Sequence, residues 1–330
     1  MFFKGQKLKF FGLLLVLIFS ISLVVGCGGQ GQLAETPEKP QVEQAAPKED
    51  TGSKVDAQQV ILDAATKYYE KMPSHIYKIT SDEVKDLLDS GTLEDYLVLD
   101  ITGHDHYAEG HIQGAIDIPF AELGQNLDLI ATNAKGKKAV LVVCWTGQTA
   151  GQTVAVLNML GINARSINLG MELGWKAKNY PMVQDAVELK AAEAYDWGDK
   201  LPVKEAVEKY FDKMPSNGMF KSYKISEPDL KDQLEKNPEK FVMIDIRGHE
   251  EYAKGTVTGA IDIPFKEVSK HFAEITEMAK GKTAVVACYT GQTAGQTDAV
   301  LNLIGIKTVS LNRGINAGWV EGNGFELVKQ

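Results

Sequence analysis

A stretch of ten residues occurs twice in this chain of 330 residues, with one letter changed. CWTGQTAGQT begins at Cys144, and CYTGQTAGQT begins at Cys288. The surrounding sequences also match, as YLVLDITGHDHYAEGHIQGAIDIPF from Tyr96 does with FVMIDIRGHEEYAKGTVTGAIDIPF from Phe241. Corresponding residues lie about 142 to 146 positions apart, and self-similarity at a nearly constant offset indicates tandem duplication of one domain. The chain is therefore expected to contain two copies of one fold.

Within one copy, segments with helical periodicity alternate with short apolar segments typical of strands. A first helix is expected over residues 60–72, before Pro73, and a second helix follows with Ser81 as its N-cap. Strands are expected in YLVLDI, GAIDIPF, KKAVLVVC and ARSINL, and a further helix in TAGQTVAVLNMLG. KKAVLVVC ends in an unbroken apolar run, which is typical of a strand covered on both faces. The predicted fold class is α/β, with two tandem domains that each hold a mostly parallel sheet flanked by helices.

The N-terminal segment has the pattern of a secretory leader. Lys4, Lys7 and Lys9 precede the apolar run FFGLLLVLIFSISLVV, and the segment ends in VVGC at Cys27. This end resembles the lipobox of bacterial lipoproteins, and the resemblance implies cleavage before Cys27 and lipidation of that cysteine. An uncleaved membrane anchor is the alternative. Both interpretations place the rest of the chain outside the cytoplasm and attached to a membrane.

These patterns divide the chain into four parts. Residues 1–27 are the expected signal peptide, and residues 28–58, rich in Gly, Pro, Gln and Glu, are expected to be a disordered tether. Residues 59–190 and 200–330 are the two expected domains, with the junction near residues 188–200. The net charge of −9 and the lack of a visible basic patch argue against a nucleic-acid partner.

Cys144 and Cys288 each follow an expected strand and precede an expected helix. Open α/β sheets bind ligands at the carboxyl ends of their strands, and a helix start offers free N–H groups and a positive dipole end. Gly147 and Gly291 allow the backbone to turn so that several N–H groups converge on one centre. This setting favours a thiolate and predicts a nucleophilic cysteine in an anion-binding cradle. The alternative is a buried and unreactive cysteine, a common fate of free thiols.

Each copy resembles a rhodanese domain, the fold of a family of sulfurtransferases. The resemblance rests on VLDITGHDHYAEGHIQGAIDIPF, CWTGQT, LNMLGI and LGMELGW in the first copy and on their counterparts in the second. It implies a six-residue loop that holds a persulfide on Cys144 and on Cys288, with no cofactor. It also implies that the loop N–H groups stabilise the charged outer sulfur. The loop residues that would bind the substrate are Trp145, Thr146, Gly147, Gln148 and Thr149, and Tyr289, Thr290, Gly291, Gln292 and Thr293.

Both loops depart from the family pattern at their last position. Where the family usually has an arginine, this chain has Thr149 and Thr293, and neither loop contains a lysine or arginine. A guanidinium is suited to gripping a dianion such as thiosulfate. Its absence favours polysulfide, a persulfide of a partner protein, or another soft oxyanion or chalcogen as the donor.

The two copies also differ from each other upstream of the loops. The family pattern D-x-R-x-x-x-E is intact in the second copy, where it implies a structural ion pair between Arg247 and Glu251. In the first copy the same two positions hold Thr102 and His106. Both copies nevertheless keep the cysteine and its loop, so two working sites are expected.

Histidines gather in GHDHYAEGH of the first copy, a composition consistent with a metal site. The ligands would be His104, Asp105, His106 and His111, but the second copy keeps only His249 of this set. Because a metal site needs converging ligands, surface histidines are the favoured interpretation, and no metal is predicted.

Two functions agree with these patterns. The first is a lipid-anchored sulfurtransferase that moves sulfane sulfur from a small donor to a thiol acceptor through persulfides on Cys144 and Cys288. The second is a non-catalytic carrier that holds sulfane sulfur, another chalcogen or a soft metal ion on the same thiols and serves a redox or respiratory partner protein. A disulfide between the two cysteines is disfavoured, because they belong to separate domains and a disulfide needs Cα atoms within about 7 Å.

Overall fold

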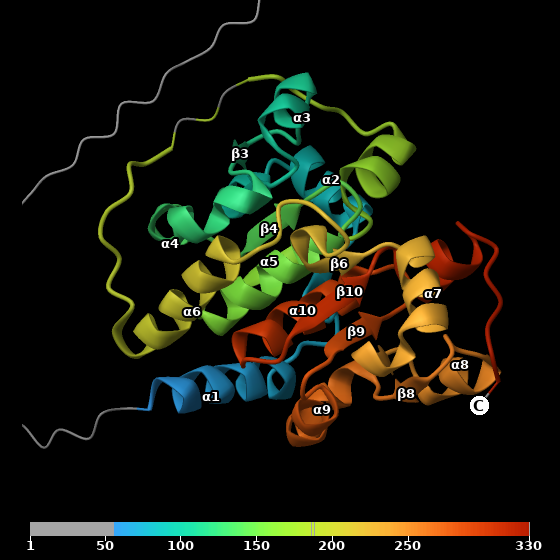
Figure 1. Cartoon of the computed structure of the whole chain (residues 1–330). Coiled ribbons are helices and arrows are strands. Elements are labelled where there is room, and N and C mark those ends of the chain that lie inside the picture. Colours follow the sequence, from blue (N-terminus) through green and yellow to red (C-terminus); the bar gives the residue numbers. More distant parts are fainter. Residues whose placement is uncertain (1–55, 186, 188, 330) are drawn as a thin grey trace, which may run out of the picture. The chain divides into compact units, whose positions relative to one another are not determined.

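The computed structural model describes residues 56–185, 187 and 189–329 (Figure 1). The expected signal peptide and nearly all of the expected tether lie outside the described residues. In the part of the chain that is described, no helix is both long enough and apolar enough to cross a membrane. Helix α1 (Ala57–Glu70) takes in the last two residues assigned to the tether, because the Asp56 side chain accepts a hydrogen bond from the Gln58 N–H and caps the helix there.

The first copy forms a five-stranded parallel sheet with the strand order β1-β5-β4-β2-β3. Every residue of β4 is buried, as expected for a central strand covered on both faces. The strands are β1 (Lys78–Ile79), β2 (Leu97–Asp100), β3 (Ala115–Asp117), β4 (Val140–Val143) and β5 (Ala164–Ile167). The helices are α2 (Ser81–Asp89), α3 (His104–Glu109), α4 (Leu127–Ala134) and α5 (Gln148–Met159).

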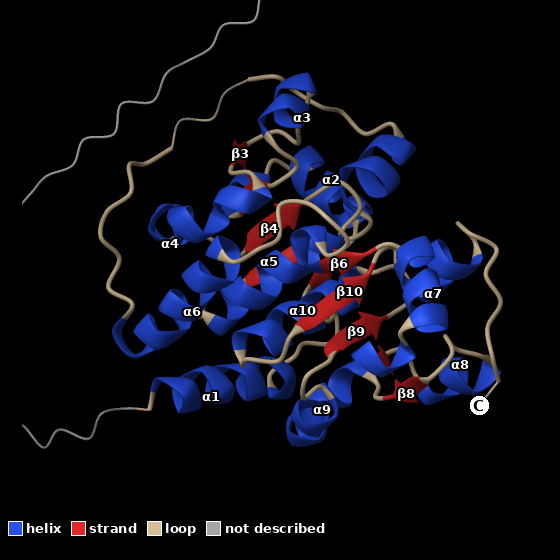
Figure 2. Ribbon diagram, viewed as in Figure 1, coloured by secondary structure: helices blue, strands red, loops and turns tan. Residues whose placement is uncertain are grey.

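The second copy repeats this arrangement with the order β6-β10-β9-β7-β8 (Figure 2). Both sheets have helices packed against them, which confirms the predicted fold class of two tandem α/β domains. The strands are β6 (Lys224–Ile225), β7 (Phe241–Asp245), β8 (Ala260–Asp262), β9 (Thr283–Ala287) and β10 (Thr308–Leu311). The helices are α6 (Leu201–Asp212), α7 (Glu227–Lys236), α8 (His249–Lys254), α9 (Phe272–Met278) and α10 (Gln292–Leu303).

Helix α2 is capped by Thr80 and not by Ser81, which corrects the expected N-cap. The Thr80 backbone is extended, and its hydroxyl accepts a hydrogen bond from the Glu83 N–H at 3.1 Å. The Glu83 carboxylate in turn accepts a hydrogen bond from the Thr80 N–H at 2.7 Å. This reciprocal pair is a capping box, and it makes Ser81 the first helical residue.

The helix that precedes each sheet packs against the opposite copy. Tyr68 in α1 donates a hydrogen bond from its hydroxyl to Gln296 Oε1 in α10 at 2.6 Å. Phe211 in α6 meets Phe120 of the first copy edge to face, with ring centroids 5.4 Å apart. One cluster of buried apolar side chains therefore includes residues of both copies, and the copies form one compact unit.

Helices α5 and α10 lie side by side and meet backbone to backbone at the repeated decapeptides (Figure 1). A Cβ on Gly151 would lie 2.2 Å from the Gln292 carbonyl oxygen, and a Cβ on Gly295 would lie 2.4 Å from the Gln148 carbonyl oxygen. Only glycine allows so close an approach. The contact between the copies is therefore a second reason, besides the cysteine, for the likeness of the two decapeptides.

Candidate functional site

Each cysteine lies directly after the central strand of its sheet. Cys144 follows β4 and Cys288 follows β9, and each is followed by a short loop and a helix of 12 residues. Both cysteines are buried, at 3% and 2% exposure, and both thiols are free. The carboxyl edge of a parallel sheet is the usual place for a ligand in an α/β fold.

Two backbone N–H groups point at each cysteine sulfur. One comes from the glycine of the loop and the other from the third residue of the helix, one position beyond the loop residues named from the sequence. These donors and the helix dipole favour negative charge on the sulfur or on an atom bound to it. The distances to Sγ are 3.1 Å from Gly147 N and 3.2 Å from Ala150 N in the first copy, and 3.2 Å from Gly291 N and 3.3 Å from Ala294 N in the second.

A turn that contains Gly170, directly after β5, packs against the backbone of the first cysteine loop. Leu169 and Gly170 both have positive φ angles, and the Met171 N–H donates a hydrogen bond to the Cys144 carbonyl at 2.8 Å. A Cβ on Gly170 would lie 2.4 Å from that carbonyl oxygen. The LGMELGW segment therefore helps to shape the cysteine loop, and the second copy has the equivalent turn at Gly314.

The side chains of Gln148 and Gln292 bond to the opposite copy, so only the backbone of these two residues is free to face a substrate in the loop. Gln148 Nε2 donates hydrogen bonds to Ser310 Oγ at 2.8 Å and to the Leu311 carbonyl at 3.1 Å. Gln292 Nε2 donates to Ser166 Oγ at 2.7 Å. Both glutamines are buried in the contact between the copies, so each carboxamide ties a cysteine loop to a strand of the other domain.

Exposed aromatic rings flank both loops. Trp145 is 36% exposed, and its ring centroid lies 4.5 Å from the His106 ring and 4.7 Å from Lys176 Nζ. Tyr289 is 43% exposed, and its ring centroid lies 6.0 Å from the Arg247 guanidinium. Cationic groups thus lie over the aromatic residue beside each cysteine, but they differ between the copies.

Of the remaining loop residues, Thr146, Thr290 and Thr149 are partly exposed and Thr293 is buried.

Arg247 forms a buried ion pair with Asp245, and the expected pair with Glu251 is wrong. Arg247 Nε and Nη2 donate hydrogen bonds to the Asp245 carboxylate at 3.0 and 2.7 Å, and Nη2 also donates to the Gly255 carbonyl at 2.7 Å. Glu251 pairs instead with Lys254 near the surface. Asp245 is the buried carboxylate at the end of β7, so it has the greater need of a cation.

In the first copy, Asp100 occupies the position of Asp245 without an arginine partner. Burial raises the pKa of the Asp100 carboxyl, and hydrogen bonds from Thr102 lower it in part. Asp100 Oδ1 accepts these bonds from the Thr102 N–H at 2.8 Å and from its hydroxyl at 2.6 Å. A threonine therefore replaces the guanidinium at this position.

The histidines of GHDHYAEGH do not converge on one point. His104 is exposed and its Nδ1 lies 2.6 Å from Asp117, while His106 is also exposed. His111 is buried, with Nδ1 2.9 Å from the Tyr107 carbonyl, so it is not the surface residue expected from the sequence. Within residues 56–185, 187 and 189–329, no group of three or more His, Cys, Asp or Glu side chains is placed to hold a metal ion.

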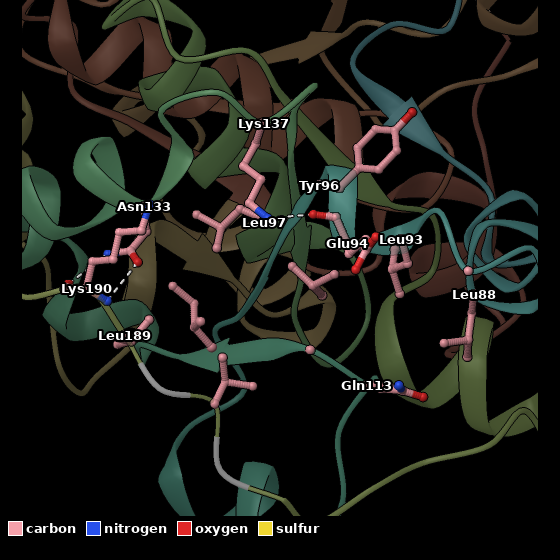
Figure 3. Close-up of a pocket in the computed structure, with 15 residues that line it drawn as sticks. Leu88, Leu93, Glu94, Tyr96, Leu97, Gln113, Asn133, Lys137, Leu189 and Lys190 are labelled. Carbon is pink, nitrogen blue, oxygen red and sulfur yellow. Dashed lines mark hydrogen bonds between the residues drawn. The ribbon is translucent and has the colours of Figure 1, made fainter.

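The pocket in Figure 3 is remote from the cysteine loops in the fold. Its volume is about 490 Å³, and no residue of either loop lines it. It is lined by Tyr96 and Leu97 at the start of β2, and by Lys137 just before β4. These are the amino ends of strands whose carboxyl ends lead to the Cys144 site. The pocket therefore lies at the opposite edge of the sheet.

Two lysines that were not singled out from the sequence lie at the contact between the copies. Lys78 and Lys224 occupy equivalent positions at the start of β1 and β6. Each pairs in register with the serine that accepts a hydrogen bond from a loop glutamine of the opposite copy. The sequence feature that could have pointed to these two lysines is the segment Tyr-Lys-Ile, which is present in both copies.

A family profile described as Rhodanese-like domain matches the chain twice, over residues 80–178 and 226–321. No curated protein matches this chain. Among solved structures, a thiosulfate sulfurtransferase from Pseudomonas aeruginosa is 16% identical, with 83% of this chain and 48% of that chain covered and a TM-score of 0.34. This chain thus spans less than half of that protein's length. A rhodanese-related protein from Thermoplasma volcanium is 24% identical over 33% of this chain and 98% of its own, with a TM-score of 0.28.

Proposed function

The chain belongs to the rhodanese-like domain family, with two such domains in tandem, and from this premise we propose that it is a lipid-anchored, extracytoplasmic sulfurtransferase. Cys144 and Cys288 are the proposed nucleophiles, and each carries sulfane sulfur as a persulfide. The acceptor is a small thiol or a thiol of a redox partner protein.

The reaction needs no external oxidant or reductant. In the first step a cysteine thiolate attacks the terminal sulfur of an anionic donor, and its electron pair forms a new S–S bond. The S–S bond inside the donor breaks, and the shortened donor leaves with the electron pair of that broken bond, as a polysulfide with one sulfur fewer or, from thiosulfate, as sulfite. In the second step an acceptor thiolate attacks the outer sulfur of the persulfide. The cysteine leaves as a thiolate, and the acceptor becomes a persulfide.

The observation that carries this proposal is the pair of N–H groups aimed at Sγ in both copies. Gly147 and Ala150 hold the first sulfur, and Gly291 and Ala294 hold the second. Preorganised N–H donors stabilise negative charge as it develops, without reorganising at the moment of reaction. The same two donors serve the cysteine in both domains.

The donor class follows from the charge of the loops. Thr149 and Thr293 stand where the family usually has an arginine, so the loops offer N–H dipoles without a forked cation. Polysulfide or a protein persulfide is therefore the proposed donor, and thiosulfate a poorer one.

The proposed location rests on the sequence alone. The basic head, the apolar run and the VVGC end support lipidation of Cys27 and export. Radiolabelled palmitate incorporated by cells into the wild type and lost in a Cys27→Ala variant would support this placement, and equal labelling of the two would oppose it.

Turnover tests the enzymatic proposal. The chain from residue 28 onward is supplied with polysulfide or thiosulfate, and sulfur transfer to a thiol or to cyanide is followed. The expected result is turnover with polysulfide that exceeds turnover with thiosulfate and is lost when both cysteines are changed to serine. Sulfur that binds both cysteines but is never released to an acceptor would show a carrier and not an enzyme.

A further inference from the structure

Neither cysteine loop contains a lysine or arginine, so the anionic sulfur has no cation from its own loop. We propose that each copy supplies this cation to the other, Lys224 to Cys144 and Lys78 to Cys288. A lysine cation beside each sulfur favours anionic sulfane-sulfur compounds as the sulfur donors. This inference rests on the proposed function, because it adds a residue and a substrate class to the same two sites.

Strand pairing places Lys224 beside the first loop. Lys224 lies directly opposite Ser310 in the parallel register of β6 and β10. Its neighbour Ile225 packs into the apolar core on one face of that sheet, so Lys224 and Ser310 lie on the other face. On that face Ser310 accepts the hydrogen bond from Gln148, which is four residues after Cys144.

The equivalent strand pairing in the first copy places Lys78 beside the second loop. Lys78 lies opposite Ser166 in the register of β1 and β5, and its neighbour Ile79 packs on the far face of the sheet. Ser166 accepts the hydrogen bond from Gln292, four residues after Cys288. The two lysines are thus placed alike, each in the domain opposite to the cysteine it serves.

Both lysines are partly buried, and no carboxylate of the described residues lies within ion-pair distance of either amine. Burial lowers the pKa of Lys224, negative charge on Cys144 and then on Asp298 raises it, and the positive charge of Lys221 lowers it. Burial also lowers the pKa of Lys78, and negative charge on Cys288 raises it. A half-buried ammonium is costly unless an anion compensates it, and a cysteine sulfur is the anion that acts on both lysines, whereas Asp298 acts on Lys224 alone.

The turn before each lysine is strained. Ile76 and Tyr77 have φ angles of 45° and 54°, and Ser222 and Tyr223 have φ angles of 55° and 53°. Consecutive non-glycine residues in the left-handed region are unfavourable and persist only where the surrounding structure requires them. Here they precede a strand whose first residue is the lysine, and the arrangement occurs in both copies.

Reactivity at each cysteine tests the pairing across the domains. Cys288→Ser leaves only Cys144, and Cys144→Ser leaves only Cys288, among the two thiols of the domains. In each background Lys224→Gln or Lys78→Gln is added, and alkylation by iodoacetate, an anion, is compared at one pH with alkylation by neutral iodoacetamide. Loading with polysulfide is measured in parallel by mass.

Lys224→Gln is expected to slow iodoacetate at Cys144 about fivefold more than iodoacetamide, and to leave Cys288 unchanged. Lys78→Gln is expected to do the reverse. Lys224→Arg should restore most of the rate, since it keeps the charge. Lys137→Gln is the control, because Lys137 is exposed and lies at the edge of the sheet opposite to Cys144.

Equal slowing of both reagents, or of both cysteines, would overturn the inference by showing a purely structural effect. Thermal unfolding of each variant identifies misfolding, and the arginine variant keeps the test valid if glutamine is not tolerated. Alkylation needs no sulfur donor. Charge-dependent alkylation without polysulfide loading would therefore keep the lysine pairing and reject the sulfurtransferase, whereas loading that ignores both lysines would do the opposite.

Discussion

The first cysteine loop depends on a glycine that is not part of it. Gly170 has a φ angle of 64°, and a Cβ there would lie 2.4 Å from the Cys144 carbonyl oxygen and 2.7 Å from that of Trp145. We expect Gly170→Ala to cost about 3 kcal/mol of unfolding free energy, through overpacking added to backbone strain. Sulfur loading at Cys144 should slow while Cys288 keeps its rate. Urea unfolding and mass spectrometry check the two parts.

Gly161→Ala is the matched control for that substitution. Gly161 also has a positive φ angle, but nothing lies within 4 Å of a Cβ placed there. It should show only the backbone strain, about 1 kcal/mol, and leave Cys144 unaffected. Equal effects of the two alanines on Cys144 would contradict the steric explanation.

Arg247 and Asp245 form the buried ion pair of the second copy. We expect Arg247→Ala to lower the free energy of unfolding by about 3–5 kcal/mol, because it leaves the buried Asp245 carboxylate without its cation. Lys254→Ala removes the exposed pair with Glu251 and should have a much smaller effect. Denaturant unfolding of both variants measures this, and a larger loss for Lys254→Ala would show that the pair had been assigned wrongly.

At the scale of elements, α5 and α10 couple the two sites. Gly295 in α10 packs against the Gln148 carbonyl, and Gln148 belongs to the loop of the other copy. Gly295→Ala is therefore expected to cost about 2 kcal/mol by overpacking and to slow sulfur loading at Cys144, although the change is in the second domain. Loading rates at each cysteine and the unfolding free energy are the measurements. Gly305→Ala, with open space at its Cβ, should leave Cys144 unaffected.

The sequence allowed the elements to be predicted better than their partners. Alternating helices and strands, and cysteines at strand ends, follow from local periodicity and were confirmed by the sheets around β4 and β9. The contact of α1 with the second copy could not be predicted, since an amphipathic face does not say what covers it. The bonds of the Gln148 side chain to the other copy could not be predicted, because position in a loop does not fix where a long side chain points. Arg247 was assigned the wrong carboxylate for the same reason.

At the scale of the whole molecule, one buried acid distinguishes the two halves of the contact. Asp298 in α10 is fully buried and accepts hydrogen bonds from Gln152 Nε2 at 3.2 and 3.1 Å. The matching residue in α5 is Val154. Burial raises the pKa of Asp298 well above its ordinary value of 3.8, and hydrogen bonds with Ser310 and Gln152 offset this only in part. The positive charge of Lys224 also opposes the effect of burial, which remains the largest cause and favours the protonated carboxyl.

Asp298→Asn is expected to change how stability depends on pH. A carboxyl whose pKa is raised by folding stabilises the native state while protonated, and this contribution is lost as the pH rises from 3.8 through the raised value. The unfolding free energy of the variant minus that of the wild type should therefore increase with pH across this window. Urea unfolding at several pH values measures the difference. A difference that is constant or falls with pH would contradict a buried, protonated Asp298.

The central claim is that the molecule carries two persulfide sites, and intact mass tests it most directly. The chain from residue 28 onward is exposed to polysulfide as the wild type, as Cys144→Ser, as Cys288→Ser and as the double variant. We predict one thiol-removable sulfur atom on each single variant, two on the wild type and none on the double variant. Free thiols in every form after exposure, or a gain of mass that persists in the double variant, would contradict the account.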